Sequence, residues 1–259
     1  MGIINVTPDS FSDGGRHFQF ESAIEHARQL VDEGADILDI GGESTRPGAL
    51  PVSVKQEMER VLPVIDGLLG VSVPISVDTS KSEVMRAAIA AGAQMVNDIN
   101  ALTDTAAMHE IASSNVAVCL MHKQGDPQTM QTQPHYQNVV TDVTEYLRKR
   151  IAAAEAAGIQ RNRIVIDPGF GFGKTLEHNL ALIRELHHLT ELGVPVLAGL
   201  SRKSMLGALT GCEVTQRLPA SIAAALIAVQ RGAAIVRVHD VKETVDALKI
   251  LNAVNGELG

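Results

Sequence analysis

Short runs rich in Val, Ile and Leu alternate with longer amphipathic stretches along the whole chain. The runs predict buried strands, and the stretches between them predict helices. The predicted strands are 2–6, 36–40, 73–77, 94–99, 116–121, 163–166, 194–198 and 234–238. The predicted helices are 21–33, 54–69, 81–91, 106–113, 138–157, 177–191, 217–231 and 241–254. Eight such units without a linker predict one α/β domain over residues 1–259, a single (β/α)8 TIM barrel. An open doubly wound sheet would usually carry a dinucleotide glycine fingerprint, and none follows the first strand.

Local signals mark where the helices begin and end. Polar residues expected to cap helix N-termini are Ser22, Ser53, Ser80 and Asp240. Glycines expected to end helices in the left-handed conformation are Gly34, Gly92, Gly158, Gly193 and Gly232. Each of these glycines stands a few residues before a predicted strand, so the unit of helix, glycine and strand recurs along the chain.

Charge and hydropathy exclude several classes of partner. The chain of 259 residues has 22 Lys and Arg against 30 Asp and Glu, a net charge of −8, so we expect no binding to nucleic acid or to an anionic membrane surface. No apolar run reaches the roughly 18 residues that a membrane span needs. Cys119 and Cys212 lack the spacing of a zinc or redox pair. We therefore expect free thiols and a cytoplasmic location.

Polar residues lie near the end of almost every predicted strand or just after it, where barrel enzymes place their chemistry. They are Asn5, Asp78, Asn97, Asp98, His122, Asp167, Lys203, Arg237 and His239, with the loops 6–15 and 41–48. A single carboxylate such as Asp78 could simply cap the next helix, although Ser80 is also available for that role. The whole set exceeds what capping requires, and it predicts a site for a polar small molecule.

The basic residues indicate that this small molecule is anionic. Guanidinium, ammonium and imidazole groups together with an amide suit phosphate oxygens and a Mg²⁺ ion that keeps its waters. The residues concerned are Asn5, Arg46, Arg202, Lys203, Arg237 and His239. The glycine-rich run 167–175 is not a nucleotide phosphate loop, because Pro168 occupies the position of its first glycine. Among nine histidines none forms a metal-binding pair, and only His239 and His122 are functional candidates.

Eight segments resemble, in order and spacing, the motifs of the dihydropteroate synthase family. They are MGIINVTPDSFSDGG (1–15), GGESTRPGA (41–49), SVDTSK (76–81), NDI (97–99), MH (121–122), DPGFGFGKT (167–175), SRKS (201–204) and RVHD (237–240). The resemblance implies a transferase of folate biosynthesis that joins 6-hydroxymethyl-7,8-dihydropterin diphosphate to p-aminobenzoate. In the family, diphosphate departs first and the arylamine then attacks the pterin methyl cation. The resemblance also implies Mg²⁺, inhibition by sulfonamides and a homodimer formed through the last helices. The family usually has a further segment before the first strand, which residues 1–259 lack.

Site roles are implied by the same resemblance. The implied pterin-binding residues are Asp78, Asn97, Ile99, Met121, Asp167, Gly199 and Lys203. The implied diphosphate-binding residues are Asn5, Thr45, Arg46, Arg237 and His239, with Asn5 also at the metal. The implied p-aminobenzoate-binding residues are Phe11, Thr45, Pro47, Phe172 and Ser204. Asp78, Lys203 and Arg46 are the implied catalytic residues.

Two other functions remain open at this point. A methyltetrahydrofolate-binding methyltransferase shares a pterin site, but the 201–204 motif, the 41–48 loop and the ending at 237–239 favour the synthase. A non-catalytic pterin-binding paralogue would lose the diphosphate residues. Asn5, Thr45, Arg46, Arg237 and His239 are all present, which favours turnover.

Overall fold

The computed structural model describes residues 1–6, 16–44, 49–125, 130 and 134–256. Its strands are β1 (Gly2–Asn5), β2 (Leu38–Gly41), β3 (Ile75–Asp78), β4 (Met95–Asp98), β5 (Ala117–Met121), β6 (Ile164–Asp167), β7 (Leu197–Ala198) and β8 (Ile235–Val236). Its α-helices are α1 (Arg16–Asp32), α2 (Val54–Gly67), α3 (Ser82–Ala90), α4 (Thr105–Ala112), α5 (Val139–Ala156), α6 (Leu176–Arg184), α7 (His187–Thr190), α8 (Ser204–Thr210), α9 (Leu218–Gln230) and α10 (Val241–Asn255). No helix in these described ranges is long and apolar enough to cross a membrane.

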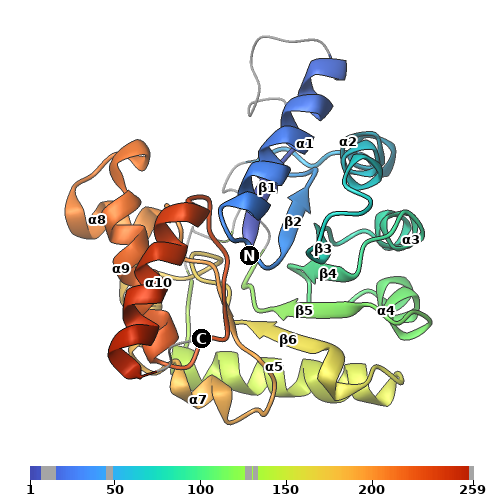
Figure 1. Ribbon diagram of the computed structural model, residues 1–259. Coiled ribbons are helices and arrows are strands. Elements are labelled where there is room, and N and C mark those ends of the chain that lie inside the picture. Colours follow the sequence, from blue (N-terminus) through green and yellow to red (C-terminus); the bar gives the residue numbers. More distant parts are fainter. Residues whose placement is uncertain (7–15, 45–48, 126–129, 131–133, 257–259) are drawn as a thin grey trace.

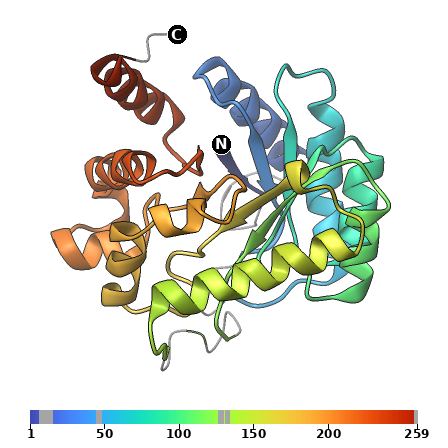
Figure 2. The same ribbon diagram turned by 90° about the horizontal axis from the view of Figure 1, so that it is seen from below.

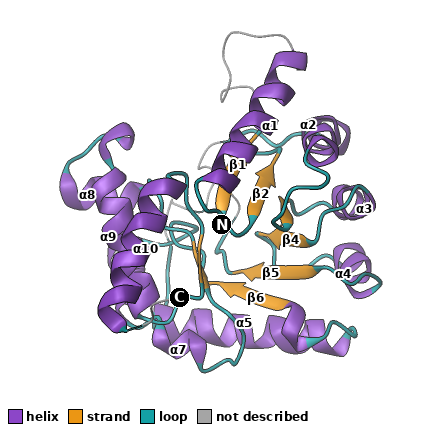
Figure 3. Cartoon of the chain, viewed as in Figure 1, coloured by secondary structure: helices purple, strands orange, loops and turns teal. Residues whose placement is uncertain are grey.

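The strands close into a ring. β1 to β6 form one parallel sheet in chain order, and β7 pairs with β8. A parallel bridge between Ile166 and Val196 joins β6 to the start of β7. A second bridge, between Gly2 and Val238, joins β8 to β1, and the N–H of Ile3 donates to the Val238 carbonyl at 3.0 Å. The strands lie at the centre with the helices outside them (Figures 1 and 3), which confirms the predicted (β/α)8 barrel.

The helices surround the ring almost completely. α1 to α4 lie on one side and α8 to α10 on the opposite side (Figure 1), and the long α5 covers the side between them (Figure 2). The predicted helix 177–191 is divided into α6 and α7, because Glu185 leaves the helical conformation. The short α8 was not among the predicted helical ranges, and α1 begins before the predicted residue 21.

The glycine signals for helix ends were more reliable than the capping signals. Gly34, Gly92, Gly158, Gly193 and Gly232 all have positive φ, as expected. Ser53 caps α2 in a capping box with Gln56. Ser22 lies inside α1, and Lys81 rather than Ser80 precedes α3, so those two assignments were wrong. Asp240 precedes α10 without capping it, because its carboxylate pairs with Arg202.

Alternation along each strand separates two layers of side chains. One row packs against the helices and includes Ile4, Leu38, Ile40, Val77, Val96, Val118, Ile164 and Ile166. The other row fills the barrel interior and includes Met1, Met95, Cys119, Val165 and Leu197. Side chains two residues apart on a strand share a face. Because Met95 and Val165 point into the interior, Asn97 and Asp167 point there too. The interior row therefore becomes polar at the carboxyl ends of the strands.

Candidate active site

Strand register brings the first candidate residues to one level. Asn5 pairs with Gly41, Gly41 with Asp78, and Asp78 with Asn97. A Cβ atom built on Gly41 would lie 3.8 Å from Oδ2 of Asp78 and 4.0 Å from Oδ1 of Asn5. The absence of a side chain at Gly41 thus leaves these two oxygens facing the same small space.

An ion-paired group, here called the inner cluster, joins Asp39, Asp78, Asn97 and Arg237. Nε of Arg237 donates to Oδ2 of Asp39 at 2.6 Å, and Nη2 of Arg237 donates to Oδ2 of Asp78 at 2.9 Å. Nδ2 of Asn97 also donates to Oδ2 of Asp39, at 3.0 Å. One guanidinium therefore holds two carboxylates from adjacent strands, and one of them in turn orients the amide.

Burial controls the electrostatics of the inner cluster. It raises the pKa of Asp78 to about 7, against the opposing effect of Arg237, while the neighbouring Asp39 adds repulsion. Burial also works against the charge of Arg237, but Asp39 and Asp78 more than offset it, so the pKa of Arg237 is raised. The arginine stays charged, and Asp78 is poised to titrate near neutral pH.

The inner cluster keeps unused hydrogen-bond acceptors. Within the part of the chain that the structure describes, Oδ1 of Asp39 and Oδ1 of Asn97 are buried and have no hydrogen-bond partner. Oγ of Ser76, which pairs with Asp39 in the strand register, is also buried and has no hydrogen-bond partner among these residues. Buried polar atoms without partners are costly, so these acceptors indicate a ligand that supplies N–H or O–H groups.

Asp167, Lys203 and Phe172 form the other side of the site. The N–H of Gly169 donates to Oδ1 of Asp167 at 2.6 Å, and Nζ of Lys203 lies 4.3 Å from the centre of the Phe172 ring. Burial raises the pKa of Asp167, with the Gly169 N–H and the charge of Lys203 acting in the opposite direction. A Cβ atom at Gly199 would lie 4.0 Å from Oδ2 of Asp167, so this position also borders the carboxylate.

Lys174 holds the loop that carries Phe172. Its buried ammonium lies 3.0 Å from Nδ1 of His122 and donates to the carbonyls of Gly169 at 2.9 Å and Phe172 at 3.0 Å. Burial, with the charge of Lys174, lowers the pKa of His122 to about 3, so the imidazole is neutral and accepts from the lysine. The His122 ring also packs edge-on against Tyr146. We call Lys174, His122 and the backbone carbonyls of Gly169 and Phe172 the loop anchor. Within it, the imidazole of His122 contacts Lys174 and so helps to hold the loop.

His239 and the nearby arginines are positioned by partners that the sequence did not reveal. The Ser201 hydroxyl lies 2.9 Å from Nδ1 of His239 and accepts the backbone N–H of that residue at 3.2 Å. Nε of Arg202 donates to Asp240 at 3.1 Å. Arg202, expected among the anion-binding residues, is therefore committed to an ion pair at the start of α10.

The remaining predicted site residues lie in turns, at strand or helix ends, or outside the described part of the chain. Ile99 is half-buried in the turn after β4, Met121 is buried at the end of β5, and Ser204 is the exposed first residue of α8. Asp98 belongs to the outward row and accepts from the N–H groups of Asn100 and Leu102, so it stabilises a turn. Phe11, Thr45, Arg46 and Pro47 lie outside the described residues.

Asp39 is the main residue of the site that sequence reasoning missed. Asp39 stands between Leu38 and Ile40 inside β2 and was counted only as part of the predicted strand 36–40. A signal was available, because strand alternation puts Asp39 on the same face as Gly41, the first residue of the predicted loop 41–48. A charged residue on the inward face of a buried strand is unusual unless it has partners or a ligand.

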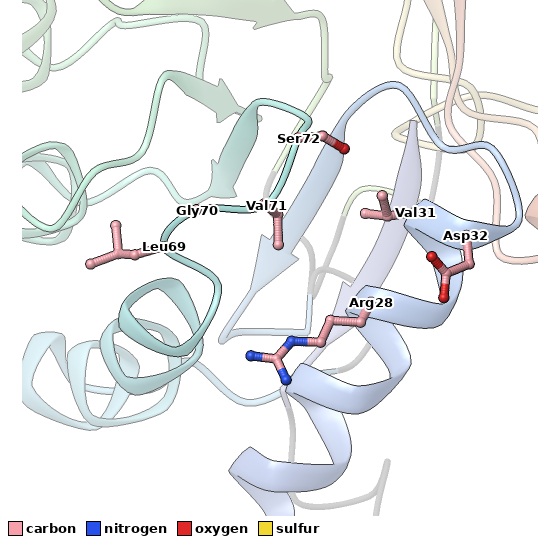
Figure 4. A pocket seen from close by; sticks show the side chains of 7 residues that line it. All are labelled: Arg28, Val31, Asp32, Leu69, Gly70, Val71 and Ser72. Atoms are coloured by element: carbon pink, nitrogen blue, oxygen red, sulfur yellow. The ribbon is translucent and has the colours of Figure 1, made fainter.

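A separate pocket of about 350 Å³ lies at the opposite end of the barrel. It opens between the end of α1 and the turn after α2 (Figure 4). Its lining residues are Arg28, Val31, Asp32, Leu69, Gly70, Val71 and Ser72. In a barrel of this type the chemistry sits at the carboxyl ends of the strands, so this pocket does not belong to the active site.

A closed (β/α)8 barrel with paired carboxylates, an amide and an arginine at the carboxyl ends of its strands defines a small-molecule enzyme. The family model for pterin binding enzymes matches residues 1–239. The dihydropteroate synthase of Escherichia coli K12 is 49% identical over 254 residues, covering 98% of this chain and 90% of that protein. The chain therefore belongs to the pterin-binding enzymes, and within them to the dihydropteroate synthase family.

Solved structures agree in fold and in sequence. Xanthomonas albilineans dihydropteroate synthase with 4-aminobenzoic acid has a TM-score of 0.93 and 55% identity, and the same enzyme with 7,8-dihydropteroate has 0.90 and 53%. Both comparisons cover 98% of this chain and 92% of the other. Yersinia pestis dihydropteroate synthase in a sulfonamide complex has a TM-score of 0.93 and 47% identity, covering 98% of this chain and 93% of that one.

Proposed function

We propose that the carboxyl-end site condenses 6-hydroxymethyl-7,8-dihydropterin diphosphate with p-aminobenzoate to give 7,8-dihydropteroate and diphosphate. The inner cluster supports this proposal most directly. Arg237 bridges Asp39 and Asp78, while Oδ1 of Asp39 and Oδ1 of Asn97 have no hydrogen-bond partner among the described residues. An aminopyrimidinone ring supplies the N–H donors that such acceptors need. Solved relatives in complex with 4-aminobenzoic acid and with 7,8-dihydropteroate support the same substrate pair.

The reaction breaks the bond between the pterin methylene carbon and a diphosphate oxygen, and forms a bond from that carbon to the arylamine nitrogen. The amine loses one proton in the exchange. Asp78 favours the positive charge that develops on the ring when diphosphate leaves. Asn97 and Asp167 hold the ring edge, with Ile99, Met121 and Gly199 beside it. Lys203 donates to ring heteroatoms while its ammonium lies over Phe172.

The diphosphate is assigned to Asn5, Arg237 and His239, together with Thr45 and Arg46 of the second loop. Ser201 supports this assignment, because it fixes the imidazole of His239. Two guanidinium donors of Arg237 bind Asp39 and Asp78, which supports a position for this residue beside the ring. The p-aminobenzoate is assigned to Phe172 and Ser204, with Phe11, Thr45 and Pro47 from the two loops. Sulfonamides would compete for this second part of the site.

The donors present suit Mg²⁺. Asn5 offers an amide oxygen near the Asp78 carboxylate, and Mg²⁺ in phosphate chemistry takes few protein oxygens together with substrate oxygens and water. Among the described residues, no group of three or more His, Cys, Asp or Glu side chains forms a metal-binding cage. We assign Asn5 as the metal contact, where a bound ion would supply positive charge to balance that of the diphosphate leaving group.

We also propose that residues 1–259 act as one pterin-binding domain in the cytoplasm, as a homodimer through the last helices. Free Cys119 and Cys212 support a reducing compartment.

Exposed apolar side chains on α8 to α10 support the dimer. They are Leu209, Ile227, Ile250 and Val254. Light scattering should give twice the mass of one chain, and Ile250→Asp should shift it towards one chain. A single-chain mass for the unmodified protein would refute the dimer.

The direct test is chromatographic detection of 7,8-dihydropteroate from the two substrates, with Mg²⁺ and with excess EDTA. We expect product that depends on both substrates and falls when EDTA is added. A folded protein that binds the pterin but forms no product would contradict the proposal and support a non-catalytic paralogue. Product formation unchanged by EDTA would remove the Mg²⁺ assignment alone.

A further inference from the structure

Asp39 connects three strands below the expected pterin ring. It lies on β2, is fully buried and sits one step deeper in the barrel than Asn97 and Asp78, because it pairs with Ser76 in the strand register. Its Oδ2 accepts from Asn97 of β4 and from Arg237, which follows β8. Nothing in the assigned reaction requires Asp39 to touch the bond that breaks.

The chemistry of a carboxylate determines how Asn97 must turn. An ionised carboxylate can only accept hydrogen bonds, whereas an amide has one accepting and one donating end. With Asp39 behind it, Asn97 directs Nδ2 towards the carboxylate at 3.0 Å. The accepting Oδ1 of Asn97 is then left for another partner, and none of the described residues supplies one.

The same carboxylate also fixes Arg237. Nε of Arg237 binds Asp39 and Nη2 binds Asp78, so the planar guanidinium is held at two points. Without Asp39, the guanidinium would keep only the Asp78 contact of these two and could rotate away from the ring.

We propose that Asp39 is a positioning residue that sets the hydrogen-bond polarity of the pterin site, holding Asn97 as an acceptor towards the ring and Arg237 beside Asp78. This inference rests on the proposed function, because it specifies how the same site recognises its pterin. The site thereby selects a ring edge that donates N–H groups. A ring that presents an acceptor at this point would face Oδ1 of Asn97 and be rejected.

Two variants that both remove the charge but differ in the accepting oxygen test the proposal. Asn97 and Arg237 donate to the same atom, Oδ2 of Asp39. Asp39→Leu removes this acceptor, so the Asn97 amide can turn and Arg237 loses one of its two contacts. Asp39→Asn keeps an amide oxygen that can take the place of Oδ2 and accept both bonds, with its NH2 group at the position of the unpartnered Oδ1.

The experiment is calorimetric titration of 6-hydroxymethylpterin into each protein, with thermal unfolding as a check of folding. We expect Asp39→Leu to weaken pterin binding about tenfold or more, which corresponds to one mispaired buried hydrogen bond, and Asp39→Asn to keep most of the affinity. The KM for p-aminobenzoate should change less than about twofold in either variant, since that substrate does not meet Asn97.

Each outcome supports or overturns the proposal. Pterin affinity of Asp39→Leu within twofold of the unmodified protein overturns it. So does a folded Asp39→Asn that binds no better than Asp39→Leu. If Asp39→Leu does not fold, Asp39→Asn alone is decisive, since near-normal affinity supports the proposal and a tenfold loss overturns it. An unmodified protein that does not bind the pterin refutes the proposed function itself, and the inference with it.

Discussion

The inner cluster and the loop anchor are both buried, charged and located at the carboxyl ends of the strands, yet they differ in how completely their polar atoms are paired. In the loop anchor, the Lys174 ammonium meets a histidine nitrogen and two nearby carbonyls. In the inner cluster, Asp39 and Asn97 each keep a buried oxygen without a partner among the described residues.

This difference distinguishes residues that support the fold of the site from residues that bind the ligand. A saturated network has no capacity left for a ligand and contributes rigidity, whereas an incompletely paired one is stabilised when a ligand supplies the missing donors. Charge and burial alone would have assigned both groups to catalysis. The pairing of each oxygen and nitrogen supports our proposal that the pterin binds against the inner cluster and that Lys174 holds the loop.

Asp78→Asn should produce the largest effect, because it removes charge from the inner cluster. We expect kcat/KM to fall about 10²–10³-fold, while the midpoint of thermal unfolding stays unchanged or rises, since ionised Asp78 is disfavoured by burial. The matched control is Asp98→Asn, a buried carboxylate on the outward face that caps a turn. It should cost about 1 kcal/mol of stability with kcat/KM of the folded enzyme within about threefold. Equal activity losses in both variants would remove the distinction.

Gly169→Ala tests the backbone of the loop anchor. Gly169 has φ +67, and an added Cβ would lie 1.9 Å from the carbonyl oxygen of His122. We expect a loss of about 3 kcal/mol or more in the free energy of unfolding, measured by urea titration. Gly158→Ala is the control, with φ +97 but no described atom within 4 Å of the added Cβ, and should cost only about 1 kcal/mol. Similar losses would show that the close contact with His122 is unimportant.

Lys174→Met removes the ammonium while keeping an unbranched side chain that is only one heavy atom shorter. The carbonyls of Gly169 and Phe172 then lose a donor, and the unfolding free energy should fall by about 2–4 kcal/mol. Pterin affinity of the folded fraction should stay within about threefold, as the ligand does not bind Lys174. Lys149→Met, an exposed lysine 3.5 Å from Glu145, should change stability by less than about 0.5 kcal/mol. A larger loss of pterin affinity than of stability in Lys174→Met would assign this residue to recognition.

The pH profile of kcat/KM tests the titration of Asp78. Because burial raises its pKa from 3.8 to about 7, the carboxyl is neutral below that pH and cannot favour a positive ring. The rate should therefore decrease as the pH falls through about 7, and Asp78→Asn should lack this limb. For stability the sign is opposite, since the folded state holds the proton more tightly than the unfolded state. Asp78 therefore lowers stability as the pH rises from 3.8 to about 7. An acid limb that persists in Asp78→Asn would assign it to another group.

The sequence predicted those features that depend on nearby residues or on strand alternation. Glycine caps such as Gly92 and Gly232 could be located because a positive φ is a local requirement. Strand ends placed Asn5, Asp78 and Asp167 at one rim, because parallel strands in a barrel end together. Pairing across the barrel could not be predicted in this way. Nothing near Arg202 in the sequence indicates that Asp240 binds it, and nothing near Asp39 indicates Arg237.

The central claim is that the inner cluster, and not the loop anchor, contacts the pterin. A crystal structure of the protein with 6-hydroxymethylpterin tests this most directly. We predict a ring N–H within hydrogen-bond distance of Oδ1 of Asn97, Arg237 still bound to Asp39 and Asp78, and Lys174 still bound to the Gly169 and Phe172 carbonyls. A ring bound against Lys174, or one that leaves Oδ1 of Asn97 without a partner, would contradict the claim.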